Sequence, residues 1–166
     1  WPFGSQAHKA PLSFEFSHGR ERIFVNCGTH PTDAEWQEVL KATPAHNTVT
    51  IDDRNVYEAQ ESFMRMQQNI VEVDRDNKRD SCLISASHDG YVSQNGILHR
   101  RRFYLADKGF DLRGEETLSC STGLTHNHTA NVRFHLHPRV MVSLIKDGKE
   151  ALLRPATGPG WRFTIE

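Results

Sequence analysis

Cysteine, long apolar runs and an excess of either charge are all scarce in this sequence of 166 residues. The three cysteines, Cys27, Cys82 and Cys120, are widely spaced and form no CxxC pair. This argues against a disulfide framework or a thiolate zinc site and favours buried free thiols. No apolar run is long enough to span a membrane. The net charge is −1, so neither nucleic acid nor a membrane is an expected partner, and any anion site must be local.

Two common catalytic signatures are also missing. The chain has no GxSxG motif for a serine nucleophile and no GxxxxGK[ST] motif for a phosphate-binding loop. It begins at Trp1, with neither an initiator methionine nor a signal peptide. We therefore expect a piece of a longer protein, whose compartment, bacterial periplasm or cytoplasm, is encoded elsewhere.

The length fits one domain, residues 1–166, with a single core. Apolar and polar residues alternate in many short segments, and glycine or proline marks most turns between them. This pattern predicts a mainly β fold, an antiparallel two-layer β-sandwich with one short helix near residues 33–42. The expected strands are residues 12–17, 22–27, 44–52, 70–73, 81–87, 97–105, 110–118, 131–137, 140–145, 150–153 and 161–165, with a weaker one at 63–66 and turn-rich segments at 74–80 and 90–96.

The expected helix has signals at both ends. Residues 32–35 fit a capping box with Thr32 as the N-cap, and Trp36, Val39 and Leu40 fall on one apolar stripe. The helix should end by residue 43, because Pro44 disfavours a helical residue before it.

Two hairpins are expected from their turns. Pairing Ser17 with Arg22 across a four-residue turn brings Ser13 opposite Asn26, beside the segment that carries His8. The second hairpin has Asp-Gly at residues 147–148, a strong turn signal between strands.

Ten histidines are the unusual count in this composition. His46 lies on the polar face of the expected strand 44–52, whose other face carries Val49 and Ile51. With His8 and Asn26 it supplies two imidazoles and an oxygen, which together with a water satisfy a tetrahedral metal, and Zn²⁺ is the metal expected for this set. The alternative is a solvated histidine at a strand edge.

Two further clusters of basic side chains are candidate sites. His126, His128, His135 and His137 form two HxH pairs; His135 and His137 could chelate together from one strand face, and the alternative is an exposed polar face.

The second cluster is a cationic run at residues 99–102. His99 and Arg101 project on one face of the expected strand and Arg102 on the other, so this run could bind an anionic sugar. The alternative is a solvated face whose arginines pair with Glu115, Glu116 or Asp111.

Several blocks carry a resemblance to a known family. They are Ala-His-Lys-Ala-Pro-Leu at 7–12, Val-Asn-Cys-Gly at 25–28, Ala-His-Asn-Thr-Val at 45–49 with Asp52, His-Asp-Gly-Tyr at 88–91 with His-Arg-Arg at 99–101, and Arg-Phe-His-Leu-His-Pro at 133–138. In this order and spacing they resemble the C-terminal β-sandwich of the heparinase II/III family of polysaccharide lyases.

This resemblance implies a partner domain and a reaction. In the family, an N-terminal α/α toroid packs on the sandwich, and the cleft between them holds an acidic, uronate-containing polysaccharide such as a glycosaminoglycan, which is cleaved by β-elimination. This chain would supply one wall of that cleft and would lack the toroid. His8 and His46 match two metal ligands of some members, and Asn26 stands where those members have aspartate.

The chain also departs from the family pattern. Active relatives show His-x-His-x-Asp in the first block, where this sequence has Gln6, His8 and Ala10. The resemblance thus implies that one histidine and one carboxylate are absent, and that the isolated chain is inactive. Two alternatives stay open: a non-catalytic carbohydrate-binding or structural β-sandwich module, and a stand-alone histidine metalloenzyme.

Overall fold

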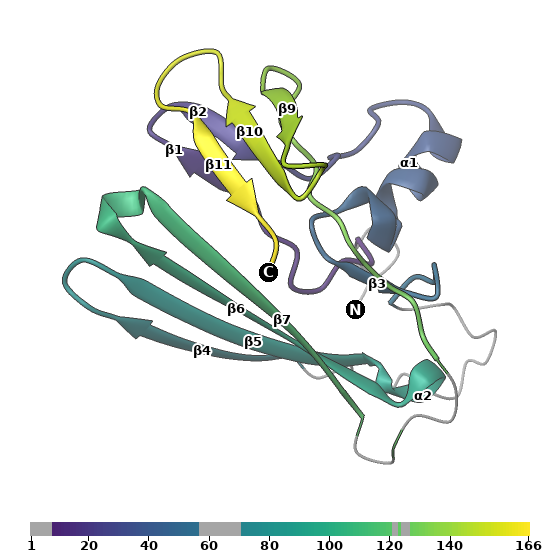
Figure 1. The fold of residues 1–166 in the computed structure, drawn as a ribbon. Helices are drawn as coiled ribbons and strands as arrows, with labels where there is room; N and C mark the ends of the chain where they lie inside the picture. Colours follow the sequence, from purple (N-terminus) through teal and green to yellow (C-terminus); the bar gives the residue numbers. More distant parts are fainter. Residues whose placement is uncertain (1–7, 57–70, 121–122, 124–126) are drawn as a thin grey trace.

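The computed structural model describes residues 8–56, 71–120, 123 and 127–166, and it confirms the mainly β fold. A four-stranded antiparallel sheet, in the order β4-β5-β6-β7, faces three smaller sheets, β1-β2, β11-β10-β9 and β3-β8 (Figure 1). The strands are β1 Phe16–His18, β2 Glu21–Phe24, β3 Val49–Ile51, β4 Val71–Asn77, β5 Cys82–Tyr91, β6 Ile97–Ala106, β7 Asp111–Cys120, β8 Ala130–Val132, β9 Met141–Ile145, β10 Glu150–Arg154 and β11 Trp161–Thr164.

Short helices complete these elements. They are α1, Ala34–Lys41; α2, Val92–Asn95; and two 3-10 turns, η2, Thr43–Ala45, and η3, Asp107–Gly109. None of the helices in the described residues is long and apolar enough to cross a membrane. The weaker strand predicted at 63–66 lies outside the described residues.

The long sheet has a buried face with unusual chemistry. In β6, Ile97, His99 and Arg101 are buried, whereas Leu98 and Arg100 between them are exposed. The alternation of a half-buried strand is therefore present, but two of its inward side chains are polar. Burying such groups is costly unless they are hydrogen-bonded, so they require partners from neighbouring strands.

Within the described part of the chain, two apolar clusters form the core. The larger one lies between β2, β10 and Val140, the residue before β9, and is flanked by aromatic rings; its buried members are Ile23, Phe24, Val140, Ala151 and Leu153. The other joins β3 to the long sheet through Val49, Ile51, Val56, Tyr91 and Ile97.

The first hairpin is confirmed at its turn. Ser17 pairs with Arg22, and the register shifts between Phe16 and Ser17. The strands are shorter than predicted, so Ser13 and Asn26 are not a strand pair; instead, Glu15 Oε1 accepts a hydrogen bond from the Asn26 N–H at 3.0 Å. The Asp-Gly hairpin is confirmed as well, between β9 and β10.

The predicted strand 44–52 is wrong at its start. Strand β3 begins only at Val49, because Pro44 at the first positions of η2 favours a 3-10 turn. The strand predicted at 131–137 is also too long, since β8 ends at Val132. Beyond the end of β8, the backbone N–H of His135 donates to the Asn47 side chain, so it is not available to pair with a neighbouring strand.

Strand β4 continues through the segment predicted as a turn. Asp74, Arg75 and Asp76 pair with β5 because β4 is an edge strand whose side chains are all exposed, so charge is tolerated there. The predicted turn 90–96 is largely α2, which ends at Gly96 in the left-handed conformation, φ 69°.

The predicted position of the helix is confirmed, but its predicted N-cap, Thr32, is wrong. Asp33, not Thr32, is the N-cap of α1, and its Oδ1 accepts from the N–H groups of Glu35 and Trp36 at 2.9 and 3.1 Å. Trp36 and Val39 are more than half exposed, so the expected apolar stripe is not buried by the described residues.

The cysteines differ from the expectation of burial. Cys27 is exposed, and Cys82 and Cys120 are only half-buried.

Candidate functional site: two histidine pairs

His8 and His46 meet at the end of α1. Their Nδ1 and Nε2 atoms are 2.7 Å apart, and the ring planes are nearly perpendicular. His46 is buried, with 3% of its surface exposed, whereas His8 is exposed. The segment of His8 is held in place because the N–H of Lys9 donates to the Lys41 carbonyl at 2.8 Å, and Thr43 Oγ1 donates to the Lys9 carbonyl at 2.5 Å.

The backbone sets the tautomer of His46. Its Nδ1 lies 2.9 Å from the Ala42 carbonyl oxygen, which only accepts, so Nδ1 carries the proton. Nε2 therefore presents its lone pair to the Nδ1–H of His8. Desolvation lowers the pKa of His46, partly offset by the bond to Ala42, and nearby His8 and His135 lower it further. The pair thus has a neutral, fixed inner ring and an exposed outer ring.

Asn26 lies beside the segment that carries His46, although the predicted pairing of Ser13 with Asn26 does not form. The N–H of Cys27 donates to the Ala45 carbonyl at 3.1 Å, which places the end of the hairpin against the segment of His46. The Asn26 side-chain oxygen accepts the N–H of Asn47 at 2.9 Å, so it serves the backbone.

The donor set fits a zinc ion incompletely. The His46 Nε2 lone pair, held by a proton on the other nitrogen, suits a metal ligand. However, the Asn26 oxygen is already hydrogen-bonded and brings no charge. Among the described residues, no three His, Cys, Asp or Glu side chains are grouped to hold a metal. Two imidazoles are present where a closed zinc site needs four ligands and a catalytic one three.

The HxH residues do not form a joint site. His135 Nε2 donates to the Pro44 carbonyl at 2.8 Å, whereas His137 Nδ1 accepts the N–H of Arg139 at 3.3 Å, so the two rings bind different partners. His128 Nδ1 lies 2.7 Å from a carboxylate oxygen of Asp52. His126 lies outside the described residues.

Two of the four residues of the cationic run, His99 and Arg101, are internal. His99 and Arg101 share a face, as expected, but this face is buried, with 0% and 3% exposure. Arg102 lies on the opposite face, and its side chain is 42% exposed and pairs with Glu115. Of the three predicted substrate-binding residues, only Arg102 reaches the surface in this domain.

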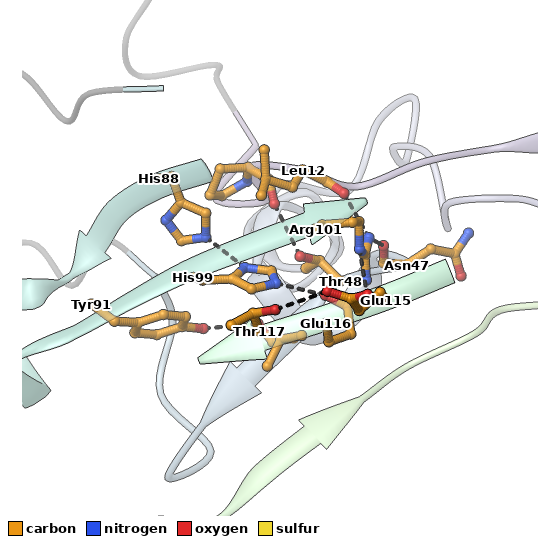
Figure 2. Close-up of polar contacts among 12 residues, drawn as sticks. Leu12, Asn47, Thr48, His88, Tyr91, His99, Arg101, Glu115, Glu116 and Thr117 are labelled. Carbon is orange, nitrogen blue, oxygen red and sulfur yellow. Dashed lines mark hydrogen bonds and ion pairs between the residues drawn. The ribbon is translucent and has the colours of Figure 1, made fainter. Parts of the chain in front are cut away.

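A second histidine pair is part of this internal network (Figure 2). His88 Nε2 lies 2.9 Å from His99 Nδ1, and His99 Nε2 lies 2.7 Å from a Glu116 oxygen. The N–H of Gly90 donates to His88 Nδ1 at 3.1 Å, so the His88 proton is on Nε2. Every ring nitrogen therefore has a partner while both rings are neutral.

Burial keeps His88 neutral. Its pKa falls to about 3, first because of desolvation and then because of the nearby His99 and Arg101. A second proton on this ring would have to displace the Gly90 N–H from Nδ1, and this loss of a hydrogen bond also favours a lowered pKa of His88.

Arg101 connects the two layers of the sandwich (Figure 2). Its Nε donates to Glu116 at 2.6 Å, and its Nη1 donates to the carbonyl oxygens of Leu12 and Asn47, both at 2.6 Å. The guanidinium carbon lies 5.3 Å from the ring centres of Phe14 and Phe103. Burial lowers the pKa of Arg101, and Glu116 opposes this. The Arg101 side chain thus holds Asn47, next to His46, and the segment that follows His8.

The chain matches a known family over its whole length. The family model described as "Heparinase II/III-like, C-terminal" matches residues 1–166. The chain belongs to this family. Among curated proteins, the heparinase II/III-like domain is similar to FtsZ-localized protein C of Caulobacter vibrioides (strain NA1000 / CB15N), with 27% identity over 175 residues. The alignment covers 96% of this chain but 30% of that relative. No solved structure matches the chain.

Proposed function

We propose that this heparinase II/III-like domain forms one wall of a cleft for β-elimination of a uronate-containing acidic polysaccharide. The other wall is an α/α toroid of the same protein, and the domain alone is inactive. The observation that supports this proposal is the His8–His46 contact at 2.7 Å, because two segments far apart in sequence converge on one pair of imidazoles.

The pair suits a supporting role in proton transfer. β-Elimination needs a group that neutralises the uronate carboxylate, a base for the C5 proton and an acid for the departing oxygen. His46 Nε2 accepts from the Nδ1–H of His8, so it fixes the orientation of the exposed His8 ring. With that proton on Nδ1, His8 has an acceptor at Nε2 for the substrate, while the toroid supplies the remaining groups.

The experiment compares histidine variants of the full-length protein. His46→Gln and His8→Ala should abolish or strongly reduce the formation of unsaturated uronate ends, followed by ultraviolet absorbance. His30→Ala, on the loop before α1, is the matched control and should keep activity. Unchanged product formation in His46→Gln, with wild-type thermal stability, would overturn the proposal.

A second candidate is a non-catalytic carbohydrate-binding or structural module. It is favoured by the internal use of His99 and Arg101, whose polar atoms serve Glu116 and the backbone. The name of the Caulobacter relative describes localisation with FtsZ and mentions no reaction. Glycan binding by the full-length protein without any unsaturated product would favour this candidate.

A further inference from the structure

A basic hollow lies at the turn between β1 and β2. It has a volume of about 330 Å³ and is lined by Arg20, Glu21, Arg22, His137 and Arg139. Arg20 lies in the turn, Glu21 and Arg22 begin β2, and the segment before β9 supplies the other two. The N–H of His137 donates to the carbonyl of Ile23 in β2 at 2.9 Å, so the two segments are fixed to each other.

The hollow carries a local excess of positive charge. Three guanidinium groups face one carboxylate, in a chain whose net charge is −1. Glu21 accepts a hydrogen bond from the Thr157 hydroxyl, and Arg22 pairs with Glu15 at 3.2 Å. Across the described residues, the guanidinium groups of Arg20 and Arg139 have neither a carboxylate nor a hydrogen-bond partner.

His137 adds a fixed donor. Its Nδ1 accepts the N–H of Arg139, which places the proton of the neutral ring on Nε2. Its carbonyl accepts the N–H of Val140 at 2.8 Å, so residues 137–140 form a hydrogen-bonded turn. The hollow thus combines two unpaired guanidinium groups with an imidazole N–H on an ordered backbone.

We propose that this hollow binds an oxyanion group, a sulfate or carboxylate, of an acidic glycan. Guanidinium groups bind such oxyanions through two parallel hydrogen bonds, and partial enclosure strengthens the contact. The glycan as the source rests on the proposed function, whereas the preference for an oxyanion follows from the hollow itself.

The hollow is separate from the histidine pair. Arg22 lines the hollow, whereas Asn26, four residues further along the chain, accepts a hydrogen bond from Asn47, the residue after His46. Four residues of extended chain span roughly 13 Å. In Figure 1 the β1–β2 turn lies away from α1, at whose end His8 and His46 meet. A polysaccharide, which is long, can contact both places at once, and a small anion cannot.

The test is a binding titration of the full-length protein. Probes are a sulfated uronate oligosaccharide, its unsulfated counterpart, inorganic sulfate and inorganic phosphate. The double substitution Arg20→Ala with Arg139→Ala should weaken oligosaccharide binding about tenfold or more, and added salt should reduce the difference. Arg20→Ala combined with Arg139→Lys, in which position 139 keeps its charge but loses the two parallel donors of a guanidinium, should recover part of the affinity that the double alanine variant loses.

Arg75→Ala is the matched control. It removes one guanidinium from β4, an edge strand of the other layer, and should leave binding unchanged. Unchanged oligosaccharide affinity in the folded double variant overturns the inference. Inorganic sulfate or phosphate that binds as tightly as the oligosaccharide overturns the glycan as the source.

The outcomes separate this inference from the proposed function. If the wild-type protein forms unsaturated product and the double variant binds glycan normally, the lyase proposal stands and the hollow is not the anion site. If binding depends on Arg20 and Arg139 but no product forms, the hollow is supported and the lyase proposal fails.

Discussion

The two histidine pairs share one geometry in opposite surroundings. In both, the ring centres are 4.9 Å apart and the planes nearly perpendicular, at 87° for His8–His46 and 89° for His88–His99. The second pair is buried and ends on Glu116, whose other oxygen binds Arg101. The first pair ends on an exposed ring. We call the buried pair, His88–His99, the closed pair, and the pair with an exposed ring, His8–His46, the open pair.

This difference separates stability from function. In the closed pair all four ring nitrogens have protein partners, so the pair has no remaining capacity for a substrate. The open pair has one ring at the surface, and its inner ring is fixed by the backbone. Arg101 links the two regions, because it binds both Glu116 and the carbonyl of Asn47, next to His46.

Removing Arg101 should break the closed network most severely. Arg101→Met fills similar space but removes the donor to one Glu116 oxygen and to the carbonyls of Leu12 and Asn47. Breaking a buried ion pair on one side costs about 3–5 kcal/mol, so the free energy of unfolding of the full-length protein should fall by this amount in chemical denaturation.

The matched control is Arg102→Met, one position along β6. Arg102 is 42% exposed and pairs with Glu115 at the surface, where such pairs contribute little. Equal destabilisation by the two substitutions would contradict the role of Arg101 in connecting the two layers.

The sequence predicted what is local and missed what depends on register. Alternation located β5, β6 and β7, and the turns located both hairpins. The run of arginines at 100–102 resembles a solvated face, because a single strand does not show which side is covered. Only the register, in which Arg101 lies opposite Glu116, shows how a buried guanidinium is neutralised.

The sequence predicted only part of the candidate site. His8 and His46 are in contact, and Asn26 accepts a hydrogen bond from Asn47, the residue after His46. The Ser13–Asn26 pairing from which the position of Asn26 was predicted does not form. The burial of His46 was missed, because the 3-10 turn at Thr43–Ala45 replaces the first residues of the predicted strand. The hollow at Arg20 and Arg139 joins two short basic segments whose proximity no local pattern indicates.

The next largest effect separates the two pairs directly. His99→Ala should destabilise the full-length protein by roughly 2–4 kcal/mol, since it leaves a cavity and deprives His88 and Glu116 of partners. His8→Ala removes an exposed ring and should stay within the error of the measurement. Comparable losses in thermal and chemical unfolding for both variants would show that the open pair is also structural.

The pH dependence should identify the closed pair. The folded pKa of His88 is about 3, below its ordinary 6.5, so the unfolded chain binds the extra proton. The stabilising contribution is fully present above pH 6.5 and is lost as the pH falls towards 3, with a slope of at most about 1.4 kcal/mol per pH unit. His88→Gln, which keeps a donor but does not titrate, should flatten the unfolding free energy over this window. Parallel curves would count against a neutral, buried His88.

The smallest expected effect concerns the open pair and zinc. Asn26→Asp keeps an acceptor for the Asn47 N–H and adds the negative charge that the donor set beside His8 and His46 lacks. Zinc affinity of the full-length protein, measured by calorimetry after chelator treatment, should rise on the order of tenfold. Asn26→Ala, the control, should not raise it, and His46→Gln in the Asp background should abolish the gain. If zinc binds equally with asparagine and aspartate at position 26, the third ligand lies elsewhere and the open pair alone does not define the metal site.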